Sequence, residues 1–192
     1  MELSEDAEGA LWDRARRDDG DAFGLLFDRH RDRVYRRALG LMANTHDAED
    51  VAAAAFFELW RKRRAVRPVQ GSVLPWLLVT TVNLSRNAQR SSSRYQRILR
   101  TMPREATVPA PSGESVETRQ RLRDSLQALS PVDGALFVLT ALEDLPLAEA
   151  AEAVGLKPST ARMRLHRARQ RLRVDLHDLN PTFQPAVEGN LP

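Results

Sequence analysis

The chain of 192 residues contains no cysteine. Disulfide bonds, thiol catalysis and cysteine-ligated zinc are therefore excluded. No long uncharged apolar run occurs either, so neither a transmembrane helix nor membrane insertion is expected. The acidic N-terminus, MELSEDAEGA, lacks the basic head and apolar stretch of a secretory signal. Together these absences favour a cytoplasmic protein.

The sequence also lacks the motifs of common active sites. Its four histidines show no spacing with carboxylates of the HExxH kind, and it has no glycine-rich phosphate loop and no nucleophile elbow. Its many acidic side chains lie on amphipathic segments, where a solvated surface accounts for them. We therefore expect a protein that is not an enzyme and that uses no metal and no cofactor.

Glycine is scarce, with nine residues, and the alternation typical of strands is almost absent. Interior segments rich in Ala, Leu, Arg and Glu favour helices. In the first half we expect helices at residues 8–17, from an N-cap at Asp21 to about 38, from an N-cap at Asp47 to about 64, and at 73–90. In the second half we expect them at residues 117–129, 131–142, 147–154 and 158–176.

The composition changes between these two sets of helices. Three serines at 91–93 and a basic stretch at 94–100 precede a segment that contains Pro103, Pro109, Pro111 and Gly113. Such a segment predicts an extended, flexible linker. The sequence thus predicts an all-α fold with two small helical domains, at residues 1–92 and 116–177, joined by a linker at 93–115 and followed by an irregular tail at 178–192.

The charge is distributed unevenly along the chain. Residues 1–20 hold three arginines against seven acids, whereas residues 51–100 hold ten basic side chains against one acid. Residues 156–173, LKPSTARMRLHRARQRLR, hold one lysine, six arginines and no acid. Basic blocks attract the phosphate backbone of nucleic acids, although a solvated surface would explain any one of them alone.

The last basic block has the pattern of a helix-turn-helix. At 100° per residue, its apolar side chains form one narrow stripe, which consists of Ala161, Leu165, Ala168 and Leu172. A short helix precedes it, Gly155 suits a tight turn, and Pro158 suits the first turn of the next helix. A two-helix corner of any helical protein can mimic this pattern, but the uninterrupted basic content favours DNA, with 158–173 as recognition helix.

The outward face of this helix carries the predicted contacts to DNA. Arg162 and Arg167 are placed to read guanine edges, and the flanking arginines suit phosphates. His166 is equally well explained as a plain surface histidine. The full predicted set is Ser159, Thr160, Arg162, Met163, Arg164, His166, Arg167, Arg169 and Arg171.

The two halves together resemble bacterial sigma factors of the small, two-domain extracytoplasmic-function (ECF) type. In the first half the resemblance is carried by DAF at 21–23, DAEDV at 47–51 and PWL at 75–77, and in the second half by LQALSP and RLHRARQRLR. It covers about residues 21–90 and 116–176. The resemblance implies a transcription initiation subunit that binds core RNA polymerase, recognises the two elements of a promoter and opens the DNA duplex.

The resemblance also implies two sites in the first half, and the loop at 66–73 lies where the family captures a flipped base. Polymerase binding is expected at Asp47, Glu49, Asp50, Phe57 and Glu58, although acids at a helix start also favour the helix dipole. Recognition of the downstream promoter element and strand opening are expected at Arg61, Lys62, Arg63, Arg64, Arg67, Asn83, Arg86, Asn87 and Arg90.

The chain departs from the family pattern at several positions. Ala53 and Ala54 stand where a Gln-Glu pair is common, which removes polar contacts to polymerase, while Met163 replaces a small polar residue and Asn87 replaces a frequent Asp. Family members are often held inactive by an anti-sigma factor, which is therefore a possible partner. The alternative function is a helix-turn-helix repressor or activator that is not a polymerase subunit.

Overall fold

The computed structural model describes the backbone of residues 5–100 and 114–177, and the side chains of residues 8–92 and 117–177. The first half forms α1 (Glu5–Ala15), α2 (Gly20–Leu41), α3 (Thr45–Arg61) and α4 (Leu74–Arg100). The second half forms α5 (Glu114–Ala128), α6 (Pro131–Phe137), the π-helix η1 (Val138–Leu142), α7 (Leu147–Ala153) and α8 (Pro158–Asp175). The predicted all-α fold is confirmed. No helix within these ranges has the length and apolar content needed to cross a membrane.

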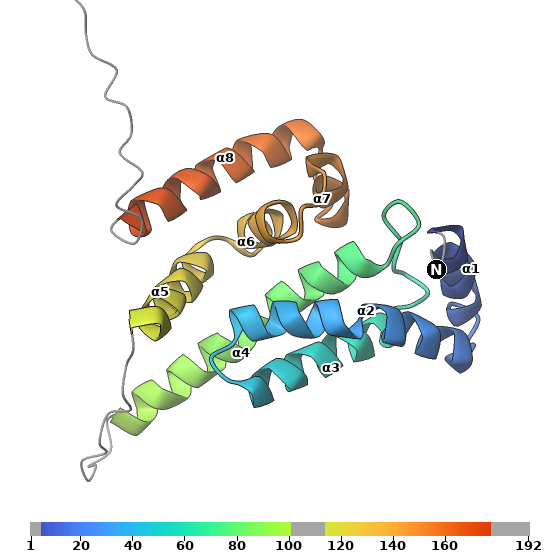
Figure 1. Ribbon diagram of the computed structural model, residues 1–192, viewed down its shortest axis with the longest axis horizontal. Coiled ribbons are helices and arrows are strands. Elements are labelled where there is room, and N and C mark those ends of the chain that lie inside the picture. Colours follow the sequence, from blue (N-terminus) through green and yellow to red (C-terminus); the bar gives the residue numbers. More distant parts are fainter. Residues whose placement is uncertain (1–4, 101–113, 178–192) are drawn as a thin grey trace, which may run out of the picture.

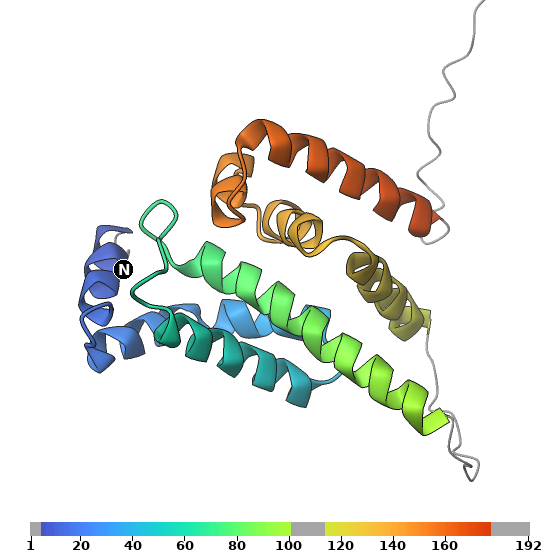
Figure 2. The same ribbon diagram turned by 180° about the vertical axis from the view of Figure 1, so that it is seen from behind.

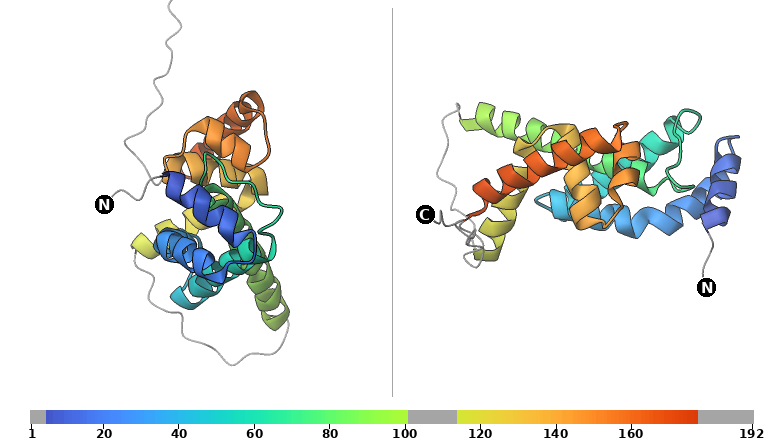
Figure 3. Two further views of the ribbon diagram at one scale, coloured as in Figure 1. Left: turned by 90° about the vertical axis from the view of Figure 1, so that its right-hand side faces the viewer. Right: turned by 90° about the horizontal axis from the view of Figure 1, so that it is seen from above.

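Helix α4, the last helix of the first half, lies at the contact between the two halves. Figures 1 and 2 show it with α2 and α3 on one side and α6 and α7 on the other. Helix α1 lies across the end of α2, beside the loop that joins α3 to α4 (Figure 1). Helix α8 lies on the outer side of the second half, away from α2 and α3, as Figure 1 and the left view of Figure 3 show.

Both predicted N-caps in the first half are wrong. Asp19, not Asp21, caps α2, and its Oδ1 accepts a hydrogen bond from the Ala22 N–H at 3.0 Å. Asn44, not Asp47, caps α3, and its Oδ1 accepts from the Asp47 N–H at 2.8 Å. Asp47 instead lies in the first turn of α3, where its negative charge still favours the helix dipole.

Several predicted helix ends also differ from the structure. Helix α1 ends at Ala15, and α3 ends at Arg61, before the predicted 17 and 64. Helix α4 continues to Arg100, so residues 93–100 of the predicted linker are helical. Serine is only mildly unfavourable inside a helix, so the serines at 91–93 do not end it. The proline-containing part of the predicted linker, 101–113, and the tail, 178–192, lie outside the described residues.

Helix α4 contributes to the apolar cores of both halves. Leu77 is fully buried among side chains of α1, α2 and α3. Its neighbour Leu78 is also fully buried, but against α6, α7 and α8, and Val82 packs with Val138 and Leu172. Because adjacent helical positions point in different directions, one helix can fill two cores. The halves are therefore packed together rather than separated.

A buried carboxylate adds a polar contact between the halves. Glu143, directly after η1, accepts hydrogen bonds from Arg33 Nε and Arg37 Nε, both at 2.6 Å. The same two arginines of α2 donate to the Glu143 carbonyl at 2.9 Å and the Leu142 carbonyl at 3.0 Å. Charge-assisted bonds of this kind are stronger than neutral ones, and the Glu143 side chain is only 5% exposed.

Replacement of Glu143 by Gln should therefore loosen the contact between the halves. Each hydrogen bond to a charged group contributes about 1.5–3 kcal/mol, so the population of separated halves should rise at least tenfold. Fluorescence energy transfer between dyes on α3 and α8 would measure that population. Glu152→Gln, which changes an exposed acid on α7, is the matched control. Equal transfer efficiency in the two variants would contradict the expectation.

Candidate nucleic-acid interface

The helix-turn-helix consists of α7, a short turn and α8. Gly155 has φ of 73°, the left-handed conformation that glycine adopts readily, and this confirms its predicted role in the turn. The Leu156 N–H donates to the Ala151 carbonyl at 2.8 Å, and the Leu156 side chain packs into the core between the two helices. The turn thus fixes the angle at which α8 leaves the domain.

Helix α8 presents a broad basic surface to solvent. The four predicted stripe residues are its buried residues, which confirms the docking face. No side chain caps its N-terminus, so the Ser159 and Thr160 N–H groups remain open to a phosphate. The predicted DNA contacts that are exposed are Ser159, Thr160, Arg162, Met163, His166, Arg167, Arg169 and Arg171.

Arg164 is the member of the predicted set that is engaged inside the domain. Its Nε donates to Asp133 Oδ1 at 2.8 Å, and another guanidinium nitrogen donates to Ser130 Oγ at 3.1 Å. Ser130 is itself the N-cap of α6, and it accepts from the Asp133 N–H. Arg164 therefore joins α8 to the start of α6, and it holds the recognition helix in place.

The basic cluster after α3 is largely paired with acids. Glu58, predicted to contact polymerase, accepts from Arg61 and lies 3.1 Å from Lys62 Nζ, and these cations hold its pKa below the usual value. Arg63 and Arg64 both donate to Asp18. The exposed Arg67 forms no ion pair with any residue that the structure describes.

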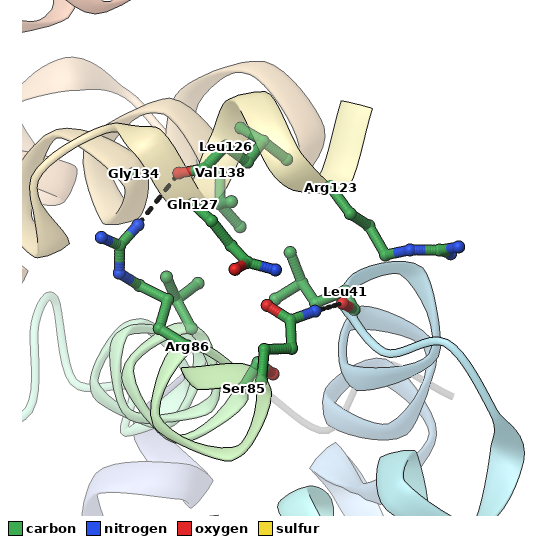
Figure 4. Close-up of a pocket in the computed structure, with 10 residues that line it drawn as sticks. Leu41, Ser85, Arg86, Arg123, Leu126, Gln127, Gly134 and Val138 are labelled. Carbon is green, nitrogen blue, oxygen red and sulfur yellow. Dashed lines mark hydrogen bonds between the residues drawn. The ribbon is translucent and has the colours of Figure 1, made fainter. Parts of the chain in front are cut away.

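Arg86, predicted to read the downstream promoter element, is buried between the two halves. It donates to the carbonyl of Leu126 at 2.9 Å, as Figure 4 shows, and to that of Leu129 at 2.5 Å, both at the C-terminal end of α5. Burial and the nearby charge of Arg90 lower the pKa of Arg86, but a guanidinium stays protonated. Its charge therefore stabilises the negative end of the α5 dipole.

The other residues of α4 that are predicted to read the downstream promoter element, Asn83, Asn87 and Arg90, remain accessible. Asn83 is half-buried, and Asn87 and Arg90 are exposed. When the two halves are packed together, these predicted residues therefore have different surroundings: Arg86 faces the second half, whereas Asn87 and Arg90 face solvent. Sequence reasoning could not separate them, since all lie on one polar side of α4 and the interdomain contact is not visible in their spacing.

An open apolar groove lies between α2 and α3, and of its lining residues only Phe57 belongs to a site predicted from the sequence. Phe57 is 64% exposed at its rim, and Phe23 and Phe27 line it from α2. The remaining lining residues are Gly20, Ala53, Phe56 and Trp60. The adjacent pair Phe56-Phe57 in the sequence indicates such an exposed aromatic surface, because a helix that packs on one face can bury only one of two adjacent side chains fully.

All five residues predicted to bind polymerase lie on α3, but of these only Phe57 lines the groove. Glu49 and Asp50 are exposed, and Asp47 is half-buried at the start of the helix. Because Ala53 lines the groove where the family commonly has a polar residue, its floor is apolar in this chain. The helix thus combines acidic side chains at its start with an aromatic surface near its end.

Fold and site together define a helical protein with an exposed basic helix in its second half and an open apolar groove in its first half. Residues 26–95 match the model of Sigma-70 region 2, and residues 119–172 match that of Sigma-70, region 4. The chain is 36% identical over 155 residues to the ECF RNA polymerase sigma factor SigE of Mycolicibacterium smegmatis, an alignment that covers 77% of this chain and 59% of SigE. It is 33% identical over 162 residues to the RNA polymerase sigma factor CarQ of Myxococcus xanthus, covering 83% of this chain and 91% of CarQ. The chain belongs to the ECF sigma factors.

Solved structures show the same fold. CnrH in complex with the cytosolic domain of CnrY matches with a TM-score of 0.60 at 23% identity, over 90% of this chain and 98% of that one. The sigma factor RpoE of Bartonella quintana, in complex with the anti-sigma factor NepR, matches with a TM-score of 0.52 at 20% identity, over 81% of this chain and 96% of that one. At these identities the likeness concerns the fold alone.

The division of α8 into reading and phosphate-contacting side chains can be tested with two substitutions. Arg167→Ala should reduce both affinity and discrimination between specific and random DNA, since a bidentate contact to guanine contributes about 1–3 kcal/mol of discrimination. Arg171→Ala should weaken both DNAs equally and reduce the salt slope by about one. Fluorescence anisotropy with the holoenzyme would measure both. Uniform weakening by Arg167→Ala would contradict its reading role.

Proposed function

We propose that this protein binds core RNA polymerase in the cytoplasm, directs it to promoters with two sequence elements and helps to open the DNA. The observation that carries this proposal is the presence, in one chain, of an exposed basic helix in a helix-turn-helix and a separate open apolar groove. A simple DNA-binding repressor needs only the first. No group of three or more histidine or acidic side chains within the described ranges is placed to hold a metal ion, and we propose a non-catalytic subunit.

Core polymerase would dock on α3 and on the groove beside it. Asp47, Glu49 and Asp50 offer acidic contacts at the helix start, and Phe57 offers a large exposed ring near the other end. Contiguous exposed apolar surface of the kind that Phe57 shares with the groove often marks an interaction site, and aromatic anchors dominate many interfaces. Glu58 would act indirectly, because its carboxylate holds Arg61 and Lys62.

The recognition helix α8 would read the upstream element of the promoter. The downstream element would be read by Asn83, Asn87 and Arg90, joined by Arg86 once the two halves separate. An unpaired base would enter the loop at residues 66–73, with Arg67 beside it to neutralise the backbone, since unpaired strands bind in basic grooves with pockets for bases. The packed arrangement would then be the resting form, because it buries Arg86.

An anti-sigma partner would stabilise this resting form. Support comes from the likeness in fold to RpoE, which was solved together with the anti-sigma factor NepR. A partner that binds the packed arrangement more tightly than the separated one shifts the population by the ratio of the two affinities. Such a partner would therefore compete with polymerase without any change in α8 itself.

Reconstitution with purified core polymerase tests the function directly. Core polymerase of the same organism should produce discrete transcripts from genomic DNA only when this protein is added, and sequencing of their 5′ ends gives the promoters. The free protein should bind duplex promoter DNA weakly. Tight duplex binding by the free protein, without association with polymerase, would instead support a repressor or activator.

Phe57→Ala should weaken binding to core polymerase about tenfold or more, because a central aromatic anchor contributes on the order of 2 kcal/mol. Since the ring is mostly exposed, its removal leaves no internal cavity and should preserve the melting temperature. Leu25→Ala, at a 54% exposed position on α2 outside the groove, is the control. Competition against a labelled sigma factor would measure the affinities, and equal values for both variants would argue against the groove as the docking site.

A further inference from the structure

The loop between α3 and α4, residues 62–73, has a defined shape. At its tip Val69 and Ser72 exchange two backbone hydrogen bonds, of 2.9 and 3.0 Å. The two residues between them, Gln70 and Gly71, have φ of 49° and 77°, as a tight turn of type I′ requires. Both are exposed, whereas Val69 is buried. The tip of the loop is therefore exposed to solvent, while Val69 beside it is buried.

Glu8 of α1 holds the end of this loop that leads into α4. Its Oε1 accepts from the Val73 N–H at 2.8 Å and from Ser72 Oγ at 2.9 Å. The same oxygen accepts from His30 Nε2 at 2.9 Å, and Oε2 lies 3.4 Å from an Arg29 guanidinium nitrogen. Burial alone would raise the pKa of Glu8, but His30 and the two loop donors bring it below the usual value.

Asp18, in the turn after α1, holds the other end of the loop. Its carboxylate accepts from Arg63 Nε at 2.7 Å and from an Arg64 guanidinium nitrogen at 2.8 Å. Asp18 has φ of 72°, in the position after a helix end where glycine is the usual residue. A glycine there would relieve backbone strain but could not pair with the arginines, so the side chain has a use that the turn alone does not require.

The segment from Glu8 to Asp18 thus contacts both ends of one loop. Between these contacts, Trp12 is 1% exposed and packs in the same apolar cluster as Val66 and Val73, which flank the loop's turn. Figure 2 shows α1 standing beside this loop. The segment lies before residue 26, where the match to Sigma-70 region 2 begins.

We propose that residues 8–18 form a positioning element for the loop at 62–73, with Glu8 and Asp18 as its two positioning residues. This proposal rests on the proposed function, in which the loop receives an unpaired base. A loop held at both ends needs no ordering when the base arrives, and preorganisation of this kind increases affinity. Neither residue touches DNA in this scheme, because both act through the loop.

The test uses holoenzyme and the non-template strand of a promoter mapped from its own transcripts. Single-stranded oligonucleotides that carry an abasic site at successive positions would be compared with the intact strand. In wild type, one position should weaken binding about fivefold or more, as expected for the loss of one stacked base. In Asp18→Gly and in Glu8→Gln this abasic penalty should fall below about twofold, and Asp18→Asn, which keeps an oxygen acceptor, should lie between.

The ratio of intact to abasic affinity separates positioning from general stability, since a smaller folded fraction lowers both affinities alike. Asp18→Gly should also keep or raise the melting temperature, because glycine suits the positive φ. Asp13→Asn, which changes an exposed acid of α1, is the control and should leave the abasic penalty unchanged.

Two outcomes would overturn the proposal in distinguishable ways. An unchanged abasic penalty in both Asp18→Gly and Glu8→Gln, with a clear penalty in wild type, would remove the positioning role and leave the proposed function intact. The absence of any sensitive position in wild type, or of any association with core polymerase, would overturn the proposed function and this inference together.

Discussion

The whole arrangement depends on α4 being buried on two sides. Leu77 faces the core of the first half, while Leu78 and Val82 face the second. A helix that fills two cores cannot leave either without exposing apolar surface, at about 25 cal/mol for each Å². The hydrogen bonds of Arg33, Arg37 and Arg86 then fix the orientation of the two halves, since each arginine donates to groups at a helix end of the second half. The relative position of the two halves follows from these two kinds of contact.

Arginine has two different uses in this protein, and the hydrogen-bond partners of each side chain distinguish them. On α8, Arg162 and Arg167 extend from a helix whose apolar stripe is satisfied, so their charge is available to a partner. Arg86 and Arg164 are instead committed to carbonyl and carboxylate groups of the protein itself. A count of basic residues in the sequence cannot distinguish these uses, because it contains no information about what faces each side chain.

The local features of the fold could be predicted from the sequence. The stripe on α8 follows from 3.6 residues per turn, and the bend at Gly155 follows from the freedom of glycine at positive φ. The features that could not be predicted depend on distant partners. Glu8 meets Val73, 65 positions away, and Arg33 meets Glu143, 110 positions away. The N-cap at Asp19 could not be predicted for a different reason, since Asp19 and Asp21 are both acceptable caps by residue type.

Trp60 belongs to two sites at once. Its ring lines the apolar groove and packs edge-on against Phe23, with ring centroids 5.0 Å apart. The guanidinium of Arg63 lies 4.2 Å above the same ring, and it also donates a hydrogen bond to Asp18. A partner that fixes Trp60 in the groove therefore also restricts the first residues of the loop. Because thermodynamic linkage is reciprocal, a base that binds the loop more tightly when Arg63 is fixed against Trp60 would in turn tighten the hold of that partner, so docking and strand capture would be cooperative through a single indole ring.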